Sequence, residues 1–267
     1  MDFSEKYRQE LGLDEAYVIK QTELLRKAVD ATAKGTSPRL DNLSTLAGEV
    51  FSFSRSTVLL SRILSVFEAY VLSRAILDTC INYCYMMVCD QDEYDRFVDF
   101  SRRNVIRALE TRAKAYEAIG KSISLPDLRA VGPIREVFLR FSSPKKGVDL
   151  TRWETAKSLT MEKKLEVIAS RVKGFNTDFF QSARLFIYED ASEIAHVTLY
   201  GSVLCTGVFW GNKDLDSAVS YAFGIIKTLY LVIGSLIDSV LLVIHTLHPI
   251  NEFVKESKRN FDALMGA

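Results

Sequence analysis

Residues 229–247 read LYLVIGSLIDSVLLVIHTL, and this stretch decides the fold. As a helix it is long enough to cross a bilayer, because about twenty apolar residues span the hydrocarbon layer. Asp238 lies near its middle, however, and a charged side chain at that depth is costly. We therefore interpret the stretch as a helix that other helices cover on every side. The helix is predicted to begin near Asp214 and to stop before Pro249, with no membrane contact.

The rest of the chain also has the apolar spacing of helices, and no stretch alternates as a strand does. Three of the five prolines fall between residues 120 and 150, which predicts an irregular crossover with one short helix near 133–141. The sequence therefore predicts an all-α, single-domain bundle of seven or eight helices over residues 1–267. The other expected helices cover residues 13–33, 40–65, 67–88, 92–118, 158–173, 177–209 and a short C-terminal stretch.

Composition narrows the classes of function. Lys plus Arg and Asp plus Glu both number 34, so the net charge is zero, which argues against binding nucleic acid or anionic membranes through overall charge. Cysteines occur at positions 80, 84, 89 and 205. No second pair at zinc-ligand spacing accompanies Cys80 and Cys84, so we expect free thiols in a reducing compartment. The N-terminal segment is too polar for a signal peptide, so we expect a cytoplasmic protein.

Polar residues form a stripe along the apolar helix expected at 67–88. Arg74, Asp78, Asn82 and Tyr85 recur at helical spacing, and Arg74 and Asp78 are placed for an ion pair between residues four apart. Burying such charges costs several kcal/mol unless every partner is satisfied. The stripe therefore indicates a polar centre with a structural or functional role.

Two more stripes lie on later helices. One carries Arg184, Tyr188, Ser192, His196 and Tyr200, four residues apart in each case. The other carries Lys227, Gly234, Asp238 and His245, where a mid-helix glycine suggests that another backbone approaches closely. Our hypothesis is that the three stripes face one another in one shared interior. Such an interior can be structural, can bind a ligand or can carry out catalysis, and the sequence leaves these alternatives open.

Two segments carry a family resemblance. LSRAILDTCINYCYMM at 72–87 and YEDASEIAH at 188–196 resemble a large, mostly bacterial, all-helical family of unknown function. That family shares an Arg-Ser/Ala-x-x-Glu helix and a Tyr-x-x-x-Ser-x-x-x-His helix, and the likeness covers about residues 45–210. The resemblance places the motif on Arg74, Asp78, Tyr188, Ser192 and His196, with Asp78 where glutamate is usual. It implies a helical fold and a role in phage defence or toxin systems.

Two classes of function remain. The leading hypothesis is a binding or signalling module for a protein or a small ligand, with Lys227 and Asp238 near the ligand. The alternative is a metal-independent, ribonuclease-like or other phosphate-handling enzyme, in which His196 is the general base and Arg74 stabilises the phosphate. Arg103 and Arg107 lie on a positive face that could hold RNA, but we expect a solvated surface there. We expect no metal and no cofactor, and the sequence leaves the oligomeric state open.

Overall fold

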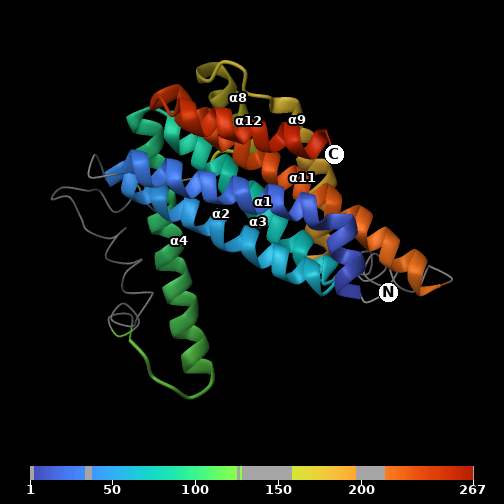
Figure 1. Ribbon diagram of the computed structural model, residues 1–267. Helices are drawn as coiled ribbons and strands as arrows, with labels where there is room; N and C mark the ends of the chain where they lie inside the picture. The colour runs from blue at the N-terminus through green and yellow to red at the C-terminus, as the bar shows by residue number, and fades with distance from the viewer. Residues whose placement is uncertain (1–2, 34–37, 125–126, 128–157, 197–213, 267) are drawn as a thin grey trace. The chain divides into compact units, whose positions relative to one another are not determined.

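The computed structural model describes residues 3–33, 38–124, 127, 158–196 and 214–266. Within these ranges it contains eight α-helices and no strand, which confirms the all-α prediction (Figure 1). The predicted short helix at 133–141 and the end of the helix predicted at 177–209 lie outside the described residues. The helices are α1 (Phe3–Ala33), α2 (Pro38–Arg62), α3 (Val66–Val88), α4 (Gln91–Ala118), α8 (Met161–Arg171), α9 (Thr177–Ala195), α11 (Leu215–Leu247) and α12 (Asn251–Met265).

The contacts between residues divide the chain into two compact units. Unit 1 combines Met1–Val88 with Met161–Ala267, and unit 2 is the segment Cys89–Thr160 between them. Of the eight helices, only α4 belongs to unit 2. Whether the two units fold as a single domain stays a prediction.

Helix α11 forms much of the core of unit 1. Its buried side chains run from Ala218 to Ile244, and it packs against α1, α3 and α12. It begins where the carboxylate of Asp214 accepts the backbone N–H of Ser217 at 2.7 Å, a usual helix cap. The helix is long and apolar enough to cross a membrane, and much of it is buried against neighbouring helices. The predicted long buried apolar helix is therefore present.

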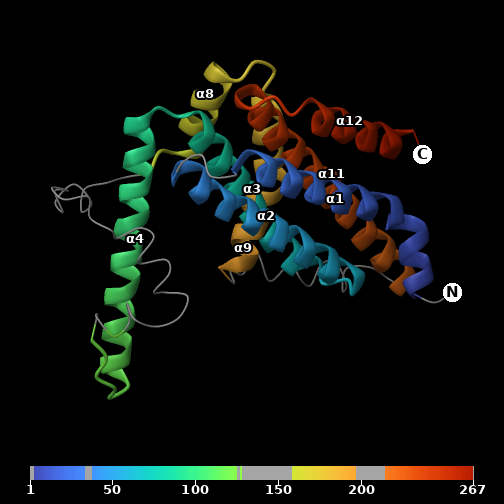
Figure 2. The ribbon, with the colours of Figure 1, turned by 60° about the vertical axis from the view of Figure 1, so that its left-hand side comes forward.

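Helix α3 is the second central element of unit 1. It packs against α2, α8, α9 and α11 (Figures 1 and 2). The carbonyl groups at its C-terminal end need partners outside the helix. Arg39 of α2 donates from Nε to the Met86 carbonyl at 2.7 Å, and Arg171 of α8 donates to the Val88 carbonyl at 2.5 Å. These arginines tie three helices together at one end of α3.

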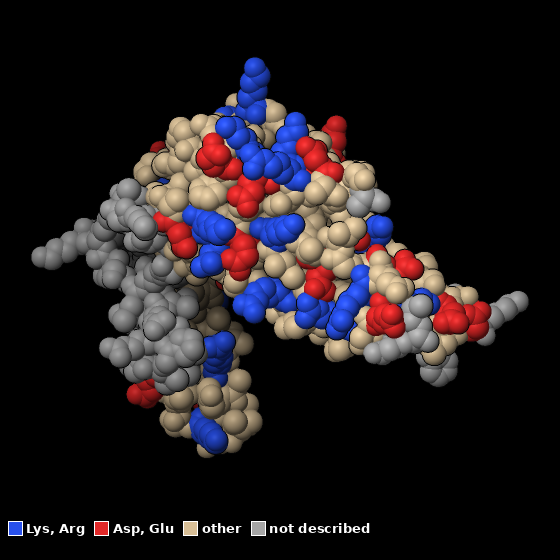
Figure 3. All heavy atoms as spheres, in the orientation of Figure 1, with Lys and Arg blue, Asp and Glu red and all other residues tan. Residues whose placement is uncertain are grey.

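The surface agrees with the neutral composition. On the face shown in Figure 3, basic and acidic side chains are interspersed over the helices of unit 1. In unit 2, Asp90 caps α4. Its side chain accepts the backbone N–H of Glu93 at 2.8 Å, and the Glu93 carboxylate accepts the N–H of Asp90 in return.

Candidate ligand-binding site on helices α3, α8 and α9

Arg74 and Tyr188 bring α3 and α9 together, as the stripes predicted. Arg74 donates from Nη2 to the Tyr188 hydroxyl at 3.1 Å, and its Cζ lies 4.2 Å from the centre of the Tyr188 ring. Arg184, one turn earlier on α9, lies 5.8 Å from the same ring. A guanidinium over an aromatic face is held by the ring quadrupole. Tyr188 therefore interacts with two arginines, one from each helix.

Asp78 does not form the predicted ion pair with Arg74. Within the described part of the chain, no cation comes within 4.0 Å of its carboxylate, and no hydrogen bond reaches it. Arg74 bonds to Tyr188 instead. Burial raises the pKa of the Asp78 carboxyl, and the charges of Arg74 and Lys164 oppose that rise. The carboxylate is half-buried, so it reaches solvent.

Lys164 of α8 completes this region, and the sequence analysis missed it. Only 8% of its surface is exposed, and its ammonium group donates to Oδ1 of Asn82 at 2.8 Å. Burial lowers the pKa of the Lys164 ammonium, and the nearby charge of Asp78 opposes that effect. Lys164 lies next to Leu165 and four residues before Ile168, on the buried stripe of α8. A lysine on an apolar stripe was the signal that could have revealed it.

We call Arg74, Asp78, Asn82, Lys164 and Tyr188 the polar centre. Except for Lys164, each of these residues is half-buried. An ion pair between Glu162 of α8 and Arg184 of α9 lies on the flank of the centre. The centre is thus accessible to solvent rather than enclosed, and it presents two cations, one anion and a phenol.

His196 lies outside the polar centre. It is the exposed C-cap of α9, and its backbone N–H donates to the carbonyl of Ser192 at 3.0 Å. No hydrogen bond or ion pair links its imidazole to the described residues. Ser192 is half-buried, and its side chain makes no bond to the centre among those residues. The expected inclusion of His196 and Ser192 in one network is therefore wrong, and Tyr200 lies outside the described residues.

Asp238 belongs to a different cluster, so the predicted single interior is also wrong at this position. Its carboxylate accepts the Tyr17 hydroxyl at 2.8 Å and further hydrogen bonds from Gln21 and Ser257. These partners come from α1 and α12. Lys227 is exposed, and its charge acts on Asp14, whose carboxyl pKa is raised by burial.

The positive face expected on residues 96–114 lies on α4, in unit 2. Arg107 is exposed, and the Cζ of Arg103 lies 5.1 Å from the Phe100 ring. Whether this face binds RNA stays a prediction. Cys80, Cys84 and Cys89 are buried and not in disulfides, and no group of three metal-ligating side chains occurs among the described residues.

Comparison with known proteins gives a family and no activity. No curated protein and no solved structure matches the chain. One family model matches residues 41–204, which include α3, α4, α8, α9 and most of α2. That model is described as "Family of unknown function (DUF5677)", and because the match covers more than half of the sequence, the chain belongs to this family.

Proposed function

We propose that the chain is a binding module whose ligand site is the polar centre. The main support for this proposal is the environment of Asp78. Its carboxylate is half-buried, yet it accepts no hydrogen bond from the described residues, while the nearby cations are bonded elsewhere. Desolvating a carboxylate without donors is unfavourable. A ligand with a hydrogen-bond donor can therefore bind this carboxylate, which solvent reaches and no described side chain occupies.

The charges of the polar centre indicate the class of ligand. Asp78 needs a donor, and Lys164 and Arg74 together give the centre an excess of positive charge. A complementary ligand carries an N–H donor close to an anionic group. Free amino acids and nucleotides share this combination, and guanidinium and ammonium groups both bind carboxylates and phosphates well.

The family model matches the part of the chain that contains the polar centre. All members of the polar centre lie within residues 41–204, whereas α1, α11 and α12 do not. The enzymatic alternative has less support, because the exposed imidazole of His196 makes no bond to Arg74 or to another described member of the centre. A role in phage defence stays a prediction.

Ligand screening of the intact protein and of Asp78→Asn tests the proposal. Thermal unfolding is followed with free amino acids and with nucleoside monophosphates, which separates the two sources of ligand. We expect one group to stabilise the original protein, by about 2.7 kcal/mol at a hundredfold excess over Kd. The same ligand should not stabilise Asp78→Asn. Without ligand, the variant should be at least as stable as the original, because burial already disfavours the charged carboxylate.

Asp190→Asn is the matched control. Asp190 lies on α9 and, like Asp78, has a carboxyl pKa raised by burial, but it is not part of the polar centre. We expect this variant to keep the ligand response. If no ligand of either group stabilises the original protein, and Asp78→Asn is clearly less stable than it, Asp78 has a structural role and the proposal is wrong.

A further inference from the structure

A second site lies between α1 and α2, apart from the polar centre. The two helices enclose a pocket of about 310 Å³ that opens to solvent. This volume is at the lower end of the range for small-molecule sites, about 300–1,000 Å³. The pocket shares no residue with the polar centre, and α1 lies outside the residues that match the family.

Half of the residues that line this pocket are apolar: Val18, Ile19, Phe51, Val58 and Leu59. Val18 and Val58 form buried parts of the lining, while Ile19 and Leu59 are 41% and 59% exposed. Large aliphatic side chains at a pocket mouth leave apolar surface in water, and a ligand that covers them gains from the hydrophobic effect. The body of a suitable ligand is therefore apolar.

The pocket also has one cation whose charge is not neutralised. Arg55 is exposed, its Cζ lies 5.5 Å from the Phe51 ring, and no carboxylate among the described residues pairs with it. Stacking on an aromatic ring leaves the guanidinium N–H groups available for an anion.

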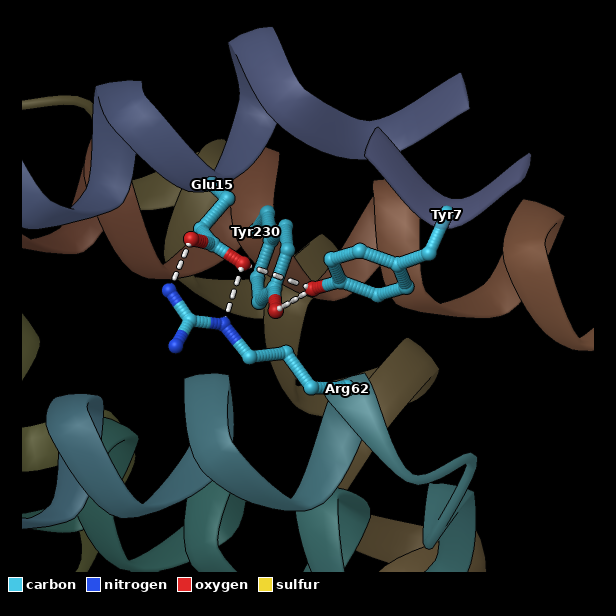
Figure 4. A network of polar contacts seen from close by, with 4 residues as sticks. All are labelled: Tyr7, Glu15, Arg62 and Tyr230. Carbon is cyan, nitrogen blue, oxygen red and sulfur yellow. Dashed lines mark hydrogen bonds and ion pairs between the residues drawn. The ribbon is translucent and has the colours of Figure 1, made fainter. Parts of the chain in front are cut away.

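The other charged residues of the lining are already paired. Glu23 forms an ion pair with Arg26 at 2.9 Å. Arg62 bonds to Glu15, whose carboxylate also accepts the hydroxyl of Tyr7 at 3.0 Å (Figure 4). The net charge offered to a ligand is therefore the single positive charge of Arg55.

We propose that the pocket between α1 and α2 binds a small amphipathic carboxylate. Its apolar chain lies against Val18, Val58 and Leu59, and its carboxylate is bound by Arg55. One cation at the edge of an aliphatic pocket complements one anionic head on an aliphatic chain, and a guanidinium can bind a carboxylate through two parallel hydrogen bonds. Neither part of such a ligand is sufficient alone.

Calorimetric titration of the full chain with octanoate, below its critical micelle concentration, tests this proposal. Octanol lacks the carboxylate, and acetate lacks the long alkyl chain, so each probe tests one part of the ligand. We expect octanoate to bind, and octanol and acetate to bind at least tenfold more weakly. Arg55→Gln should weaken octanoate binding by roughly tenfold to a hundredfold, because charge-assisted hydrogen bonds are lost. Leu59→Glu, a change at an exposed position, should also weaken octanoate binding, because the new carboxylate repels that of octanoate.

Arg259→Gln is the control for loss of an exposed arginine, since Arg259 lies on α12 and does not line the pocket. It should bind octanoate as the original protein does. Absence of octanoate binding, equal affinity for octanol, or unchanged affinity in Arg55→Gln would each overturn the proposal. Asp78→Asn should bind octanoate normally, so failure of the proposed polar-centre function leaves this site standing.

Discussion

Asp238 combines burial with three hydrogen-bond donors, and its titration should be visible in stability. Burial raises the pKa of its carboxyl above the ordinary 3.8, and hydrogen bonds from Ser257, Tyr17 and Gln21 oppose that rise. In the pH range just above 3.8, the folded chain therefore holds a proton that the unfolded chain releases. The free energy of unfolding then falls as pH rises through this range.

We predict that Asp238→Asn removes this dependence. Asparagine keeps the size of the side chain and does not titrate, so the variant should lose less stability than the original protein as pH rises from about 3.8. Urea unfolding at a series of pH values measures the difference. Parallel pH profiles for the two proteins would contradict the prediction.

Asp214→Asn is a control of opposite sign. Hydrogen bonds from Ser217 lower the pKa of the Asp214 carboxyl, so its stabilising effect is present above 3.8 and is lost as pH falls through the lowered pKa. Asparagine also caps helices well. The loss in free energy of unfolding caused by Asp214→Asn should therefore shrink as pH falls. For Asp238→Asn, by contrast, the variant should gain stability relative to the original protein as pH rises.

The packing of α1 on α11 depends on Gly234. A Cβ built at this position would overlap the Tyr17 ring, with Cζ only 2.7 Å away. The sequence suggested a close backbone, but an aromatic side chain approaches instead. The ring has little freedom to move, because the Tyr17 hydroxyl bonds to Asp238, one turn further along α11. Tyr7 and Tyr230, whose hydroxyl oxygens are 2.7 Å apart, join the same two helices at a second point (Figure 4).

We predict that Gly234→Ala destabilises the protein by about 1–3 kcal/mol through overpacking. Gly224→Ala is the matched control on the same helix, because nothing lies within 4 Å of its added Cβ. That change should stabilise by about 0.5–1 kcal/mol, the usual preference of a helix for alanine. Urea unfolding of both variants gives the comparison. If both changes stabilise the protein equally, Tyr17 moves aside freely and the packing is not tight.

Helical periodicity predicted most of the described helices, although α1 begins at Phe3 and not near residue 13 as expected. It identified α11 as a central helix, and of the stripes on α3 and α9 it correctly brought Arg74 and Tyr188 together, but not Ser192 and His196. It placed the boundary between α2 and α3 near residue 66, although no glycine marks the turn there: Leu64 takes the left-handed conformation (φ 57°) where glycine is usual.

Periodicity says which face of a helix is buried and does not say which other helix covers it. Asp238 faces Tyr17, 221 positions away, and Lys164 faces Asn82, 82 positions away. Both partners were therefore missed, and the single interior predicted from three stripes is in fact two separate clusters. The site could be located on α3 and α9, but its composition required the packing of α8.

Unit 2 is inserted between α3 and α8 of unit 1, so the question at the scale of the whole molecule is whether unit 1 folds without it. Lys164 bonds to Asn82, and Arg171 bonds to the carbonyl of Val88, so α8 runs parallel to the end of α3. These two contacts place Met161 beside a residue of α3 about nine positions before Val88. At 1.5 Å per residue, the linker from Val88 to Met161 must therefore run back roughly 14 Å along α3. A flexible linker of about ten residues has a mean span of ~17 Å, which covers this distance.

We predict that replacing Cys89–Thr160 with about ten Gly and Ser residues leaves unit 1 folded. Its core helices contact one another directly, and the Arg39 and Arg171 bonds at the end of α3 come from within unit 1. Circular dichroism should show a helical protein with one cooperative urea transition. A two-residue linker spans only about 11 Å at 3.8 Å between successive Cα atoms, so this control should prevent α8 from docking beside α3 and lower the stability sharply. If the ten-residue variant also fails to unfold cooperatively, unit 1 depends on the inserted segment, and the chain folds as the single domain that the sequence predicted.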